Sequence, residues 1–110
     1  MSAPSALESV VVGILRWPEQ LPDFTEHDLD ALQERHLAYQ RDLRERGILL
    51  AGGPLGDQPD ERMRGLCFYA VGMEEARAAA DADPSVIAGR LVVDLMTWSF
   101  LPGEITFARA

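Results

Sequence analysis

The sequence of 110 residues predicts one α+β domain in which the elements follow the order βαββαβ. Four apolar segments rich in β-branched or aromatic residues have the length and composition of strands. One long amphipathic stretch separates the first two segments, and an alanine-rich stretch separates the last two. This order is typical of the ferredoxin-like fold, in which two helices cover one face of a four-stranded antiparallel sheet. The core is expected over about residues 8–100, followed by an arm over 101–110.

The first strand and the helix after it are the clearest elements. Residues 8–17 are apolar at both odd and even positions, which is typical of a strand buried on both faces, and Pro18 ends it. Thr25 is a favourable N-cap, so the helix is expected to begin near Glu26, and Gly47 is placed to end it. One face of this helix carries a stripe of residues at spacings of three and four: Leu29, Leu32, His36, Tyr39 and Leu43.

The second half of the chain supplies the remaining elements in order. Strands are expected over 48–55, 64–72 and 90–100, with a polar loop over 56–64. An alanine-rich helix starts at Glu74 and stops at Asp83, because the residue before Pro84 is pushed away from the helical conformation. Pro84 itself can start a further helical turn through about Ala88. The tail, 101–110, is expected to form an arm or an added edge strand.

The strands carry more apolar surface than two helices can cover. In the first strand, Val10 and Val12 would face one side of the sheet while Val11 and Leu15 face the other. The third and fourth strands repeat this two-sided pattern. An exposed apolar sheet face marks an interface, so we expect a homodimer that packs sheet against sheet.

Composition excludes several classes of function. The chain has 18 Asp and Glu against 10 Arg and no Lys, and its net charge of -8 opposes binding to nucleic acid or to anionic membranes. The absence of lysine excludes Schiff-base chemistry and a P-loop. A single cysteine, Cys67, excludes an intrachain disulfide and a cysteine-rich zinc site. No apolar run has the length of a membrane span and the first residues lack a signal-peptide pattern, so we expect a cytoplasmic protein.

His36 and Asp83 are the residues best suited to chemistry. His36 lies on the stripe of the helix, so its side chain is expected to face the core. There it is either a packed side chain that hydrogen-bonds to a backbone carbonyl or a group that transfers protons. Asp83 precedes Pro84 and is either only the N-cap of the next helical turn or a carboxylate that orients the imidazole. Because the two helices of this fold lie side by side, we predict that the two side chains meet at about 2.6–3.2 Å or through one water.

The other candidates are weaker. Gly52 and Gly53 would allow a ligand to approach the backbone, although a bulge or turn explains them equally well. His27 is about half a turn out of phase with His36, so the two cannot share a metal ion. Cys67, in an apolar strand, is expected to be an inert core residue. Because the chain has no metal-binding or nucleotide-binding motif, we expect no metal site and no organic cofactor.

Two stretches of the sequence resemble the YCII-related family of small dimeric α/β-barrel proteins. They are ERHLAYQRDLRERGILLAGGPL at 34–55 and EEARAAADADPSVIAGRLVVDLMTW at 74–98. The resemblance covers about residues 8–100 and is carried by a helix histidine, the AGGP turn, the EEA and DADP strings and a last strand ending near tryptophan. The chain departs from the family pattern at Ser85, where an aromatic residue is usual, and in its long polar loop at 56–64.

The resemblance implies a dimer with a cleft in each subunit and a catalytic His-Asp pair, which falls on His36 and Asp83. The similar architecture of muconolactone isomerases suggests isomerisation, lactone rearrangement or elimination on a small organic substrate, such as one derived from an aromatic compound. One alternative is a cofactor-free monooxygenase, with Trp17 and Trp98 lining its pocket, and another is a non-catalytic small-molecule-binding protein. The residues expected to contact substrate are Gly52, Gly53, Pro54, Tyr39 and Trp98.

Overall fold

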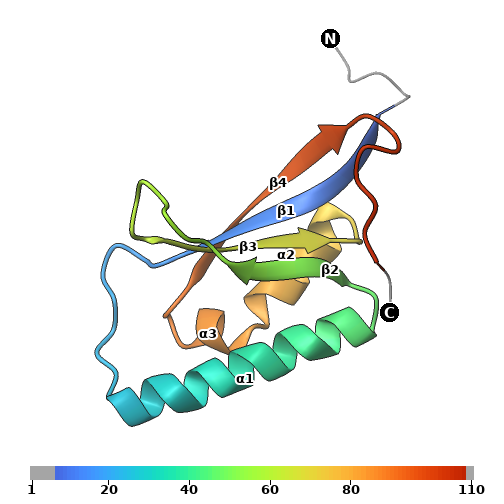
Figure 1. Cartoon of the computed structure of the whole chain (residues 1–110). Helices are drawn as coiled ribbons and strands as arrows, with labels where there is room; N and C mark the ends of the chain where they lie inside the picture. The colour runs from blue at the N-terminus through green and yellow to red at the C-terminus, as the bar shows by residue number, and fades with distance from the viewer. Residues whose placement is uncertain (1–6, 109–110) are drawn as a thin grey trace.

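The computed structural model describes residues 7–108 and has the predicted βαββαβ order, with a one-turn helix before the last strand (Figure 1). The elements are β1 (Glu8–Arg16), α1 (Glu26–Glu45), β2 (Leu49–Pro54), β3 (Met63–Tyr69), α2 (Met73–Asp81), α3 (Pro84–Ile87) and β4 (Val92–Phe100). The strand order is β2-β3-β1-β4, and all neighbouring pairs are antiparallel. The topology is ferredoxin-like, so the predicted fold class is confirmed. The end of the expected arm, 109–110, lies outside the described residues.

The long helix α1 begins and ends where the sequence supplies partners for its free backbone groups. The Thr25 hydroxyl accepts a hydrogen bond from the Asp28 amide at 3.0 Å, and the Asp28 carboxylate accepts one from the Thr25 amide at 3.4 Å. At the other end, Gly47 has a φ of 74°, which lets the Ile48 amide turn back and donate to the Leu43 carbonyl at 2.9 Å. Both ends of α1 are therefore capped, as its sequence predicts.

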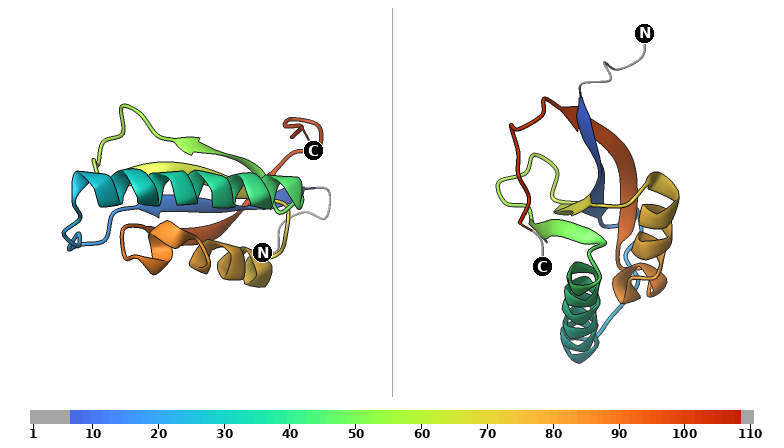
Figure 2. Two further views of the ribbon diagram at one scale, coloured as in Figure 1. Left: turned by 90° about the horizontal axis from the view of Figure 1, so that it is seen from below. Right: turned by 90° about the vertical axis from the view of Figure 1, so that its right-hand side faces the viewer.

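The helices lie on one face of the sheet, and the core fills the space between helices and sheet (Figure 2). Val11 and Leu15 of β1 point into this core, and Ala76 of α2 is completely buried against the sheet. Gly13 lies between the two β1 residues, where an added Cβ would meet the Tyr69 ring at 3.1 Å. The glycine therefore leaves room for the Tyr69 ring beside β1.

The other face of the sheet is lined with aromatic residues. The rings of Phe68 on β3 and Trp98 on β4 have centroids 6.0 Å apart, and Trp98 lies 5.1 Å from Phe100. Phe107 of the tail reaches back to within 5.4 Å of the Phe68 ring, and Figure 2 shows the tail on the side of the sheet away from α2. Residues 101–108 form no strand within the described part of the chain.

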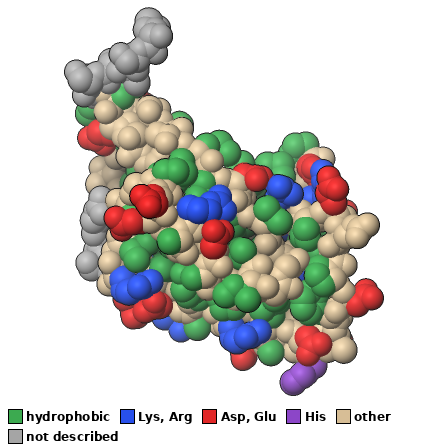
Figure 3. All heavy atoms as spheres, turned by 180° about the vertical axis from the view of Figure 1, so that it is seen from behind, with side chains coloured by type: hydrophobic (Ala, Val, Ile, Leu, Met, Phe, Trp, Pro, Cys, Tyr) green, Lys and Arg blue, Asp and Glu red, His purple; other side chains and the backbone are tan. Residues whose placement is uncertain are grey.

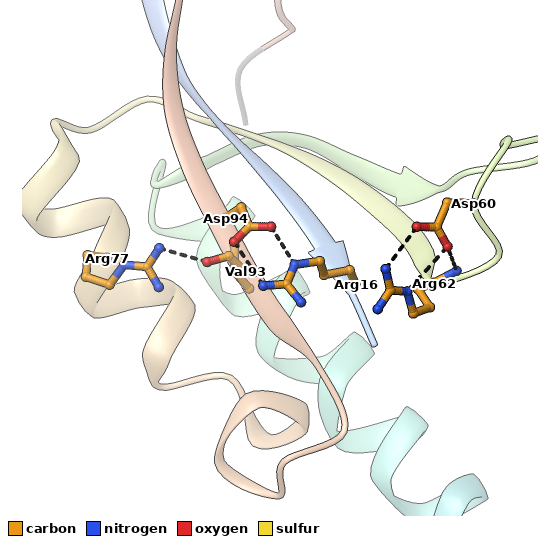
Figure 4. A network of polar contacts seen from close by, with 6 residues as sticks. All are labelled: Arg16, Asp60, Arg62, Arg77, Val93 and Asp94. Atoms are coloured by element: carbon orange, nitrogen blue, oxygen red, sulfur yellow. Dashed lines mark hydrogen bonds and ion pairs between the residues drawn. The ribbon is translucent and has the colours of Figure 1, made fainter. Parts of the chain in front are cut away.

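The surface of the molecule is charged but mixed in sign. Figure 3 shows acidic and basic side chains interspersed among hydrophobic ones on the face behind that of Figure 1. Arg77 of α2 donates to the Val93 carbonyl of β4 at 2.8 Å (Figure 4), and it also donates to Asp81 at 3.1 Å. Arg16 of β1 pairs with Asp94 of β4 at 2.6 Å. Over residues 7–108, the helices are too short or too polar to cross a membrane.

Candidate active site

The His36 and Asp83 side chains meet between α1 and α3. His36 Nδ1 and Asp83 Oδ2 are 2.7 Å apart, within the range of a hydrogen bond. Both side chains are buried, with 11% and 8% of their surface exposed. The predicted contact between the middle of the first helix and the segment after the second is therefore present, and it is shielded from water.

Asp83 owes its position to the proline that follows it. Its backbone is extended, and Pro84 supplies the first residue of α3 with a φ already suited to a helix. Asp83 Oδ1 accepts a hydrogen bond from the Ser85 amide at 2.8 Å and so caps α3, while Oδ2 faces His36. One carboxylate thus combines both interpretations that the sequence left open: it is a helix cap and a partner of the imidazole.

The other end of α3 is capped by Gly89. This residue has a φ of 77°, which allows the Arg90 amide to donate to the Ser85 carbonyl at 2.9 Å and the Gly89 amide to the Val86 carbonyl at 3.0 Å. The single turn of α3 is therefore held at both ends. This arrangement fixes Ser85 and Arg90 in place beside the His-Asp pair.

The hydrogen bond to Asp83 gives the two ring nitrogens of His36 different roles. A carboxylate only accepts hydrogen bonds, so Nδ1 carries a hydrogen and donates it to Asp83. No residue in the range 7–108 hydrogen-bonds to Nε2. Every buried side-chain nitrogen or oxygen of that range has a hydrogen-bond partner, so Nε2 is not a buried atom. Nε2 is therefore open to the cavity beside it, and in the neutral ring it carries a lone pair.

A cavity of about 360 Å³ lies next to the pair, between α1, β2, β3 and the segment from α3 to β4. Small-molecule sites in proteins are typically about 300–1,000 Å³. The polar side chains in its wall are Gln33, His36, Gln40, Arg44, Arg64, Ser85 and Arg90. Three leucines, Trp17, Pro54, Cys67 and the glycines of β2 and β3 complete the wall. Its size and mixed lining suit a small organic molecule.

The buried polar side chains of residues 7–108 all gather at this site. They are His36, Gln40, Asp83 and Ser85. Burying a polar group costs free energy unless a partner compensates it, and the His36–Asp83 hydrogen bond compensates two of these four. Gln40, one turn beyond His36, donates to the Cys67 sulfur at 3.5 Å. Burial raises the pKa of the Cys67 thiol to about 11, so the thiol lines the cavity as a neutral group.

Comparison with known proteins assigns the family. The sequence model of the YCII-related domain matches residues 13–99, a span that includes the whole site. The chain belongs to the YCII-related family. Among solved structures, it is similar to the 5-chloro-2-hydroxyhydroquinone dehydrochlorinase TftG from Burkholderia phenoliruptrix AC1100, in complex with 2,5-dihydroxybenzoquinone. The TM-score is 0.47 at 21% sequence identity, covering 88% of this chain and 97% of that chain. Comparison with curated protein sequences gives no match.

In this YCII-related domain, three of the five residues expected to contact substrate line the cavity. They are Gly52, Gly53 and Pro54 of β2. A Cβ added at Gly52 would meet the Cys67 sulfur at 3.3 Å and the Gln40 side-chain oxygen at 3.5 Å, whereas one at Gly53 would meet nothing within 4 Å. The first of these glycines therefore permits β2 to pass close to the site.

The other two expected residues, Tyr39 and Trp98, do not line the cavity. Tyr39 turns towards α2, where its hydroxyl donates to the Ala79 carbonyl at 2.7 Å. Trp98 lies on the aromatic face of the sheet, because alternate residues of a strand face opposite sides and Val93 of the same strand points to the helices. Tyr39 therefore joins two helices, and Trp98 belongs to the opposite face of the YCII-related domain.

Sequence reasoning missed five polar residues of the cavity wall: Gln33, Gln40, Arg44, Arg64 and Arg90. Gln40 and Arg44 follow His36 by one and two helical turns, so the helix period alone could have placed them on its face. Arg64 and Arg90 come from different elements and meet only through the fold. No local pattern in the sequence points to them.

The buried polar side chains at the site besides His36 are one carboxylate, one amide and one hydroxyl, from Asp83, Gln40 and Ser85. Over the described part of the chain, 7–108, no three His, Cys, Asp or Glu side chains lie close enough to hold a metal ion. His27 is exposed near the start of α1 and takes no part in the site. The donor set around His36 is suited to hydrogen bonding and to proton transfer.

Proposed function

We propose that this protein is an enzyme that transfers a proton on a small organic substrate, with His36 as the general acid and base. The observation that carries the proposal is the asymmetry of the imidazole. Its Nδ1 is bound to a buried carboxylate at 2.7 Å, while its Nε2 is open to a cavity of about 360 Å³. This is the arrangement in which a carboxylate orients a catalytic histidine towards a bound molecule.

In the proposed reaction, Nε2 removes a proton from an acidic C–H or O–H group of the substrate. Asp83 is a positioning residue that holds the ring and stabilises the imidazolium that forms. Nε2 then returns the proton to another atom, which gives isomerisation or lactone rearrangement, or to a departing group, which gives elimination. Each step requires only a proton carrier, so we propose a reaction without metal or organic cofactor. The Ser85 hydroxyl and the Gln40 amide, both in the cavity wall, can stabilise a developing oxyanion.

Proton transfer can be tested before the natural substrate is known. The protein is incubated in D2O with a panel of enolisable ketones, unsaturated lactones and carbonyl compounds with a β leaving group, and hydrogen exchange or conversion is followed by proton NMR. We expect at least one compound to exchange or react with the native protein. His36→Asn, which retains a donor towards Asp83 but lacks Nε2, should lose this activity.

A matched control is provided by the second histidine of the same helix. His27→Asn removes an imidazole at an exposed position outside the cavity and should leave the activity unchanged. Binding of a panel compound without any exchange would favour the non-catalytic binding protein. Oxygen uptake with phenolic compounds would favour the monooxygenase. Equal activity of His36→Asn and the native protein would contradict the proposal.

We also propose that two copies of the chain pack through the aromatic face of the sheet. Met96 and Trp98 on this face are 44% and 39% exposed, and helices cover only the opposite face. Burying this surface against a second copy removes apolar area from water. Sedimentation velocity should show a dimer for the native chain and for Ile87→Glu, which alters an exposed residue of α3, but a monomer for Met96→Glu. A native monomer at low concentration would contradict the dimer.

A further inference from the structure

The charged side chains in the wall of the cavity are all positive. Arg44 of α1, Arg64 of β3 and Arg90 after α3 line it, and the described residues place no aspartate or glutamate in the same wall. The chain as a whole carries a net charge of -8, so the cavity has the opposite sign to the molecule. A concave site lined by one sign of charge concentrates small molecules of the other sign.

These three arginines are also free of ion pairs within the described residues. Of the six other arginines in 7–108, four pair with an aspartate, namely Arg16, Arg46, Arg62 and Arg77, three of which appear in Figure 4, whereas Arg35 and Arg41 are exposed on α1. With 18 acidic residues in the chain, partners for a guanidinium are plentiful. The three arginines of the cavity differ from Arg35 and Arg41 in that they converge on one concave site without a carboxylate, so their positive charge is available to a ligand there.

Trp17 and nearby carbonyl groups hold the arginines without neutralising them. The Arg64 guanidinium lies 4.3 Å from the centre of the Trp17 ring, and that of Arg90 lies 5.3 Å from it. Arg64 also donates to the Glu61 carbonyl at 2.9 Å. Two cations are thus oriented beside one indole ring, and each keeps donors for a further partner because a guanidinium has five N–H groups.

We propose that the cavity binds an organic anion, whose carboxylate is held by Arg64 and Arg90 while the rest of the molecule faces His36 Nε2. This inference rests on the proposed proton transfer at His36 and names the class of its substrate. The planar fork of a guanidinium matches the two oxygens of a carboxylate. The same positive charge stabilises the negative charge that develops when Nε2 removes a proton from the bound molecule.

The test compares an anion with a neutral molecule of the same shape. The isotope-labelled protein is titrated with benzoate and with benzamide, and the shifts of cavity amides give the two dissociation constants. Benzoate should bind at least about tenfold more tightly than benzamide, since hydrogen bonds to charged partners are stronger. High salt should weaken benzoate binding and leave benzamide binding unchanged. Equal binding of the two molecules would overturn the proposal.

Substitutions of single arginines test which residues bind the carboxylate of benzoate. Arg64→Gln and Arg90→Gln should each weaken benzoate binding by at least about tenfold, and Arg90→Lys, which keeps the charge, should weaken it less. Arg41→Gln removes an exposed arginine of α1 outside the cavity and should have no effect, which controls for net charge. If both glutamine variants bind benzoate as the native protein does, the assignment to these arginines is wrong.

His36→Asn separates this proposal from the proposed function. The variant should keep its preference for benzoate over benzamide while losing proton transfer. Anion preference together with full activity of His36→Asn would refute the role of His36 and leave the anion site in place. Loss of activity in His36→Asn together with equal binding of benzoate and benzamide would support the role of His36 and refute the anion site.

Discussion

The two hydrogen bonds of the Asp83 carboxylate make different substitutions at this residue distinguishable. Asp83→Ala removes the cap on the Ser85 amide at 2.8 Å and leaves the buried Nδ1–H of His36 without an acceptor. Loss of the cap costs about 1 kcal/mol, and the unsatisfied donor costs about 1–3 kcal/mol more. The free energy of unfolding should therefore fall by about 2–4 kcal/mol, which for a chain of this length lowers Tm by about 8–17 °C.

Asp83→Asn should behave differently because an amide can make both contacts. Its oxygen can accept from the Ser85 amide, and its NH2 group can then donate to His36 Nδ1 only if the ring hydrogen moves to Nε2. The unfolding free energy should fall by only about 1 kcal/mol, since a neutral bond replaces a charge-assisted one. The imidazole would then present a donor to the cavity in place of a lone pair, so the variant should be folded but inactive as a base.

The tautomer can be observed directly. Long-range nitrogen-proton NMR spectra of the neutral ring distinguish a hydrogen on Nδ1 from one on Nε2. We expect Nδ1–H in the native protein and Nε2–H in Asp83→Asn, a change that would not occur if Asp83 only capped α3. The same tautomer in both proteins, or equal losses of stability in the alanine and asparagine variants, would refute this account of the pair.

Further predictions concern the core. Leu32→Ala and Leu43→Ala should each lower the unfolding free energy by about 2–5 kcal/mol in urea titrations, because both leucines are 3% exposed, whereas His27→Ala should be nearly silent. Gly13→Ala should cost about 1–3 kcal/mol in the same assay, because the added methyl group meets the Tyr69 ring at 3.1 Å. Because the folded pKa of Cys67 is raised to about 11, the unfolded chain loses the thiol proton first as pH rises, and stability falls. Between about pH 8 and pH 10.5, the free energy of unfolding of the native protein should fall by about 2 kcal/mol more than that of Cys67→Ala. Equal losses in the two proteins would show that the thiol is not buried.

The sequence contains enough local information to predict most elements of the fold. Thr25 and Gly47 mark the ends of α1 because each supplies the backbone partner that a helix end requires. The pairing of His36 with Asp83 was also predictable, since a βαββαβ fold brings the middle of the first helix to the segment after the second. The predicted strands extended one to three residues too far, because apolar composition continues beyond the last ladder hydrogen bond.

The wall of the site could not be predicted in the same way. The sequence predicts substrate contacts for Tyr39 and Trp98, but the Tyr39 hydroxyl donates to the Ala79 carbonyl and strand parity places Trp98 on the face of the sheet away from the cavity. Arg64 and Arg90 are brought together by Trp17, which is distant from both in sequence. The cluster of these three side chains depends on tertiary contacts, so no periodicity or motif in the sequence predicts it.

The most direct measurement of the central claim is the position of a bound ligand. A crystal structure of the protein soaked with benzoate should place the molecule in the cavity, with His36 Nε2 within about 3–3.5 Å of it and the His36–Asp83 hydrogen bond intact. A structure in which benzoate binds elsewhere, or in which Nε2 turns away to a protein partner, would contradict the assignment of His36 as the base.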